Sequence, residues 1–198
     1  MYNIMKRKSL LAVALLTFLM MQACQNANKK TTEMQSAAID SAMKEDVVTD
    51  TSGINRGANL TIFMNEAALA GIMEIELGKL AEQKATSPKI QDFAKMMVKD
   101  HTKIAARLKK LAEDKKTTLP TALPKADQDH IAELQKMPVN EFEKHYMGMM
   151  VKDHIKALDL FKSATTSGDT PIQNFAIGTL RTLEWHYKQA IAINDHLK

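Results

Sequence analysis

The chain has 198 residues, with 27 Lys and Arg against 23 Asp and Glu, which gives a formal net charge of +4 at pH 7. Segment 1–23 contains three of the basic residues and no acidic one, so the rest of the chain is nearly neutral. A near-neutral chain offers no broad basic face, and we therefore expect no nucleic-acid partner. The single cysteine excludes an intramolecular disulfide.

Residues 1–23 are typical of a bacterial export signal, with a basic stretch at 6–8 followed by an apolar run at 10–21. The run is too short for a comfortable membrane-spanning helix. It ends at Ala23-Cys24, and a small residue before a lone cysteine resembles a lipoprotein signal-peptidase site. Cys24 is therefore the predicted site of lipidation, with an ordinary secretory signal as the alternative.

The segment 24–58 is polar, with almost no large apolar residues. It cannot bury enough surface to offset its ordering entropy, so we expect a flexible tether with a reach on the order of 30 Å. Gln25, rather than an aspartate, follows Cys24, which favours the outer membrane. We predict an envelope lipoprotein anchored in that membrane, with an envelope protein as a further candidate partner.

The domain 59–198 is rich in Ala, Leu, Met, Lys and Glu, and its apolar residues recur every three or four positions. This pattern predicts an all-α fold. The first of four long helices is expected over 60–86. The other three are expected to begin at Ser87-Pro88, after Pro138 and at Thr170-Pro171.

These starts have recognisable helix-initiation signals. Ser87 and Thr170 are suitable N-caps before a proline in the first turn, and Asn140 and Glu143 have capping-box spacing. Short connections make each helix pair an antiparallel hairpin. The longer segment 115–140, with a short helix near 127–136, can cross the length of a bundle. Two hairpins joined by one long crossover form the ferritin-like four-helix arrangement.

The hexapeptide Met-Met-Val-Lys-Asp-His occurs twice, at 96–101 and at 149–154. In both copies the histidine, His101 or His154, lies on the apolar stripe of its predicted helix. The predicted first and fourth helices each have one ionisable residue on their apolar stripe as well. On the first helix this residue is Glu74, with Glu76 as the alternative, and on the fourth helix it is His186.

The distances along the helices place these four residues at a similar height. At about 1.5 Å per residue, His101 and His154 each lie about 20 Å from the start of their helix. Glu74 lies about 18 Å from the first hairpin turn and His186 about 22 Å from the second. We therefore predict that they converge near the middle of the bundle.

Three imidazoles and one carboxylate can bind one divalent transition metal such as Zn, Cu, Fe or Ni. Asp100 and Asp153 could orient the imidazoles or pair with neighbouring lysines. Met97 and Met150, one turn before the histidines, would suit Cu(I), although methionine is common packing material. The alternative is a polar layer that binds nothing and only fixes the packing of a structural, interaction or stress-related bundle.

Several motifs resemble a family of predicted bacterial envelope proteins called domain of unknown function 4142, which is placed with ferritin-like bundles. The likeness spans about 60–197, and its motifs are at 73–81, 93–102, 142–146, 151–154 and 183–186. The resemblance implies a ferritin-like fold and an envelope location, but no activity.

Two enzyme classes are disfavoured, and we identify no catalytic residue. A di-iron centre of the ferritin-like kind uses Glu-x-x-His on two helices, and this motif is absent from the chain. No serine or cysteine lies in a motif with a base and an orienting group, which disfavours a nucleophilic hydrolase. His130, His145 and His196 are expected at the surface.

Overall fold

The computed structural model describes residues 51–197, which form five α-helices and no strand. In chain order the helices are α1 (Thr51–Lys84), α2 (Pro88–Asp114), α3 (Lys125–Lys136), α4 (Val139–Ala164) and α5 (Thr170–Asp195). The predicted all-α class is therefore confirmed. No helix in this part of the chain is both long and apolar enough to cross a membrane. The predicted export signal and Cys24 lie outside the described residues.

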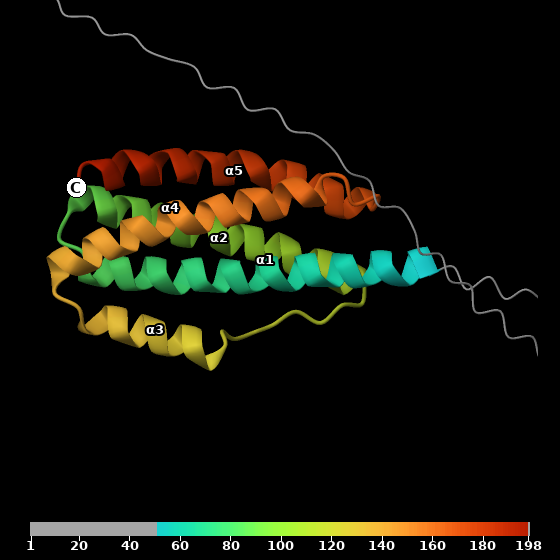
Figure 1. Ribbon diagram of the computed structural model, residues 1–198, viewed down its shortest axis with the longest axis horizontal. Coiled ribbons are helices and arrows are strands. Elements are labelled where there is room, and N and C mark those ends of the chain that lie inside the picture. Colours follow the sequence, from blue (N-terminus) through green and yellow to red (C-terminus); the bar gives the residue numbers. More distant parts are fainter. Residues whose placement is uncertain (1–50, 198) are drawn as a thin grey trace, which may run out of the picture. The chain divides into compact units, whose positions relative to one another are not determined.

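Two helical hairpins make up most of the structure. Helix α1 packs along α2, and α4 packs along α5, as the short connections predict. Further contacts join α1 to α4 and α2 to α5, so the four long helices surround one core. Helix α3 lies in the connection between the hairpins and packs on α1 (Figure 1). It returns the chain to the end of the bundle where α2 begins (Figure 1).

Helix α1 is longer than its apolar pattern predicts. It begins at Thr51 rather than at 60, so the last eight residues of the predicted tether are helical. No proline occurs between Thr51 and the predicted start, so nothing in this segment interrupts backbone hydrogen bonding. The predicted start of this helix near residue 60 is therefore wrong.

The helix starts lie where proline and polar residues predict them, but two caps differ from expectation. Ser87 occupies the N-cap of α2 before Pro88, yet its side chain makes no capping hydrogen bond. At α5 the cap is Asp169 rather than Thr170, because the Asp169 carboxylate accepts a hydrogen bond from the Ile172 N–H at 3.1 Å. At α5 the Asp169 carboxylate thus replaces the Thr170 hydroxyl that was expected as the cap.

The predicted capping box of Asn140 and Glu143 is wrong. Pro138 occupies the N-cap of α4, which has no side-chain cap. Glu143 is buried, and its Oε1 accepts hydrogen bonds from the backbone N–H groups of Thr86 and Ser87 at 2.7 and 2.8 Å. The turn before α2 leaves these donors without helical partners, and α4 supplies the acceptor. Glu143 therefore joins the two hairpins.

Two apolar clusters fill the bundle, with a polar layer between them. One cluster includes Phe63 and Phe161, whose ring centroids lie 5.3 Å apart in an edge contact. The other includes Phe93 and Phe142. Between the clusters along each long helix lies one buried ionisable residue, and these residues are Glu74, His101, His154 and His186.

Candidate metal centre

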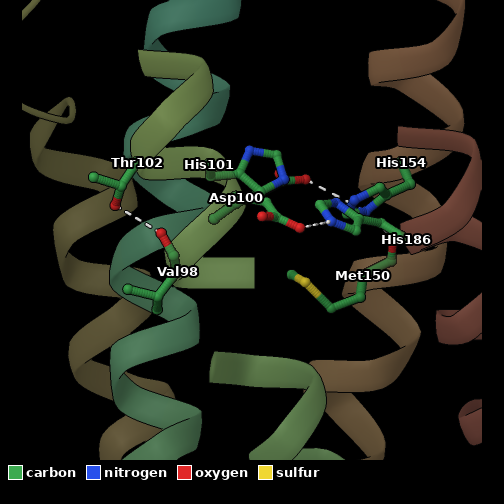
Figure 2. Close-up of polar contacts among 8 residues, drawn as sticks. Val98, Asp100, His101, Thr102, Met150, His154 and His186 are labelled. Carbon is green, nitrogen blue, oxygen red and sulfur yellow. Dashed lines mark hydrogen bonds and ion pairs between the residues drawn. The ribbon is translucent and has the colours of Figure 1, made fainter. Parts of the chain in front are cut away.

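Three buried histidines from three helices meet at the middle of the bundle. His101 comes from α2, His154 from α4 and His186 from α5, and none is more than 4 % exposed. One nitrogen of each ring lies within 4.8 Å of the others. Figure 2 shows the rings gathered in the space between the helices. The structure thus brings together all three histidines that the sequence singles out.

Helix α1 contributes Glu74, which is 2 % exposed, to the same layer. Its Oε2 lies 2.6 Å from His101 Nε2, and its Oε1 lies 3.4 Å from His154 Nδ1. Glu76 instead pairs with Lys79 at the surface, with 2.8 Å between the charged atoms. The carboxylate beside the histidines is therefore that of Glu74, which the sequence could not distinguish from Glu76.

Hydrogen bonds orient two of the rings. His154 Nδ1 donates to the Met150 carbonyl oxygen at 2.8 Å, so its Nε2 has the free lone pair. His186 Nε2 donates to Asp100 Oδ2 at 3.3 Å, so its Nδ1 has the free lone pair (Figure 2). Metal-bound histidines use the second ring nitrogen in this way, on a carbonyl or a carboxylate.

Each ring also has a buried nitrogen without a hydrogen-bond partner. These atoms are His101 Nε2, His154 Nε2 and His186 Nδ1, three of the five such side-chain atoms in the described residues. His101 Nε2 still lies 2.6 Å from Glu74 Oε2, a contact that is an ion pair when the ring is protonated. A buried polar atom without a partner costs about 1–3 kcal/mol, so the layer is incomplete as a hydrogen-bonded network.

The electrostatics of the layer favour a cation. Burial by itself raises the pKa of Glu74, but the charges of His101 and His154 outweigh it and hold this pKa at about 2. Burial lowers the pKa of His186 to about 4, and repulsion from the other two histidines acts in the same direction. At neutral pH Glu74 is therefore anionic and His186 neutral, the states in which these groups bind metals.

The residues expected to support the histidines have different surroundings. Asp100 contacts both His186 and Lys103, with 3.5 Å between Lys103 Nζ and its carboxylate. Asp153 pairs with Lys156 at 3.1 Å. The predicted roles of orienting a histidine and pairing with a lysine are thus both seen for Asp100, whereas Asp153 shows an ion pair with lysine.

The candidate sulfur ligands and the outer histidines have other neighbours. Met97 and Met150 are fully buried within the apolar cluster on one side of the layer. His145 and His196 are exposed and His130 is half-buried, in agreement with a surface location. The rings of His130 and His145 face each other with centroids 5.8 Å apart, a pairing between α3 and α4 that the sequence did not indicate.

Tyr146 is a buried polar residue that the sequence did not single out. Its side chain is fully buried, and its hydroxyl has no hydrogen-bond partner. Burial raises its pKa above the usual value, so the phenol remains protonated. Tyr146 lies eight residues before His154, a spacing that places both side chains on the same face of the helix. This spacing could have identified Tyr146 as a buried residue from the sequence.

The chain was compared with protein families, curated proteins and solved structures. No curated protein and no solved structure matches it. The family described as "Domain of unknown function (DUF4142)" matches residues 42–193, which include all four residues of the buried polar layer. The match covers well over half of the chain, and the protein therefore belongs to the DUF4142 family.

Proposed function

We propose that the helical domain binds one divalent transition-metal ion through His101, His154, His186 and Glu74. The observation that supports this most directly is the convergence of three buried imidazoles, each with an unpaired nitrogen. A single cation would satisfy all three nitrogens and would neutralise the buried carboxylate. Glu74 and His186 need not change their charge at neutral pH, because Glu74 is already anionic and His186 neutral.

The donor set fits a tetrahedral ion. Three imidazole nitrogens and one carboxylate oxygen suit Zn²⁺, and imidazole also binds Cu, Fe and Ni. With metal–nitrogen bonds of about 2.1 Å, two tetrahedral ligands lie about 3.4 Å apart. The ring nitrogens, within 4.8 Å of one another, would therefore move closer by small side-chain rotations.

A packing layer without metal is the second candidate function. The 2.6 Å ion pair between Glu74 and His101 favours it, since a paired carboxylate and imidazole can stabilise a core and fix its register. In that case the bundle acts through its exposed faces, on an envelope protein. The free His154 Nε2 and His186 Nδ1 weigh against this candidate, because a layer that served packing alone would gain by pairing them.

Elemental analysis of tag-free protein separates the two candidates. We expect about one metal ion per chain in the wild type and none in His101→Ala/His154→Ala. The matched control is His130→Ala/His145→Ala, which removes the histidine pair between α3 and α4 and should retain the metal. A folded wild type without metal, purified under metal-replete conditions, would support the packing layer. Metal retained in the first double variant would show that the ligands are assigned wrongly.

We further propose that the bundle is ferritin-like and that lipid on Cys24 anchors it at the outer membrane. The two hairpins and the return of the chain along α1 support the first proposal. The apolar run 10–21 before Ala23-Cys24 supports the second. Cys24→Ser should move the protein from the membrane to the soluble envelope fraction. Unchanged membrane fractionation would count against the lipid.

A further inference from the structure

A small cavity lies directly beside the polar layer. Its volume is about 20 Å³, and Glu74 and His101 form part of its wall. A cavity needs about 10–15 Å³ to hold one water molecule, so this one has room for a single water-sized ligand. The rest of its wall is apolar and includes Gly71 and several alanines, which leave the space open.

The cavity lies on one side of the proposed ligand set. Glu74 and His101 are the only polar side chains in its wall, and neither His154 nor His186 borders it. A buried water requires two to four polar partners. The wall supplies the Glu74 carboxylate, and the second partner would be a metal ion held by His101 Nε2 and the other ligands.

A surface groove between α1 and α4 leads towards the cavity. The groove has a volume of about 380 Å³, and it shares Ala70, Glu74 and Ala157 with the cavity wall. Glu66 and Asp153 line its outer part. One carboxylate and two methyl side chains thus border both the cavity and the groove.

We propose that the cavity binds one exchangeable water-sized ligand directly on the metal ion. This inference rests on the proposed metal site and adds a fifth position to its four protein ligands. Zinc in reactive sites can expand from four to five ligands when an external molecule binds. Because the cavity is water-sized, the ligand class is water or hydroxide, held between Glu74 and the metal.

Two glycines provide a matched pair of variants. A Cβ atom built at Gly71 or at Gly148 meets no other atom within 4 Å, so both positions have room for at least a methyl group. Gly71 lines the cavity, whereas Gly148 lies on α4 and does not. Gly71→Leu should fill the cavity, and Gly148→Leu controls for adding a leucine to a helix. Gly71→Ala is the milder variant should the leucine prevent folding.

The full-length protein would be loaded with one equivalent of Cu²⁺, and pulsed electron paramagnetic resonance in deuterated water would detect deuterons on a metal-bound water. We expect this deuteron signal in the wild type and in Gly148→Leu. In Gly71→Leu it should fall at least about two-fold with bound copper unchanged, and in Gly71→Ala it should fall by less. His101→Ala/His154→Ala provides the blank for copper bound elsewhere.

Two results would overturn the inference. The first is a wild-type site that binds copper but shows no water deuterons, and the second is an equal signal after Gly71→Leu. Either result leaves the metal site itself intact. Folded wild type that binds no more copper than the blank would instead refute the metal site, and the bound water with it.

Discussion

The two copies of Met-Met-Val-Lys-Asp-His have the same residues but different neighbours. In α2, Asp100 borders α5, and its Oδ2 accepts a hydrogen bond from the His186 ring N–H at 3.3 Å. In α4, Asp153 lines the groove beside α1, and Glu74 is the layer residue that also lines it. An anionic carboxylate offers no hydrogen-bond donor, and Asp153 pairs with Lys156 of its own helix.

The histidines of the two copies differ in a related way. His101 Nε2 lies 2.6 Å from Glu74, whereas His154 approaches Glu74 through Nδ1 at 3.4 Å and donates to the Met150 carbonyl. Local sequence therefore buries both histidines at the same height. The helix that each copy faces determines which ring nitrogen approaches Glu74 and what the neighbouring aspartate binds.

The largest expected effect is at Glu74, which both copies contact. Glu74→Gln keeps the side-chain size but removes the charge and one metal ligand. We expect metal affinity, measured by competition with a chelator, to fall more than about 100-fold, beyond the roughly 10- to 100-fold cost of changing a residue outside the ligand set. Glu76→Gln should leave affinity unchanged because Glu76 pairs with Lys79 at the surface. Equal affinities of the two variants would remove Glu74 from the site.

The next effect concerns His186, whose ring lies 5.2 and 5.4 Å from the His101 and His154 rings. Its pKa is about 4 in the folded protein, against 6.5 for an unperturbed histidine. Between these values the unfolded chain takes up a proton that the folded protein does not, so acid destabilises the metal-free protein. From pH 6.5 down to 4 the free energy of unfolding should fall by on the order of 2–3 kcal/mol from this residue, with no change above pH 6.5.

Urea unfolding of the metal-free protein at several pH values measures this dependence. In His186→Gln the contribution between pH 4 and 6.5 should disappear, while the loss from Glu74 below its ordinary pKa of 4.5 remains. An identical pH profile for the variant and the wild type would show that His186 is not held neutral.

The smallest effect separates the two aspartates. Asp100→Asn should lower metal affinity by about 10- to 100-fold, because it weakens the hydrogen bond that orients His186. Asp153→Asn removes only an ion pair with Lys156, a residue at the surface, and should change affinity by less than about two-fold. Competition titrations on both variants test the difference. An equal loss of metal affinity in the two variants would show that Asp100 and Asp153 support the site equally, which would contradict the difference in their contacts.

Much of this architecture follows from periodicity alone. The apolar stripes of α2 and α4 place His101 and His154 in the core, and the structure buries both. The choice between Glu74 and Glu76 could not be made in this way. Helix α1 packs against α2, α3 and α4, so apolar residues surround more of it and its stripe is broad.

Residue spacing and helical rise are local properties, so the sequence was enough to predict the number of long helices, the burial of the histidines and the shared height of the polar layer. Tertiary structure decided the pairing of Asp100 with His186 and the capping of the α2 turn by Glu143, partners 86 and 57 residues apart. It also decided the cavity beside Glu74. These features depend on how each helix is rotated and which helix lies next to it, and no single segment encodes that.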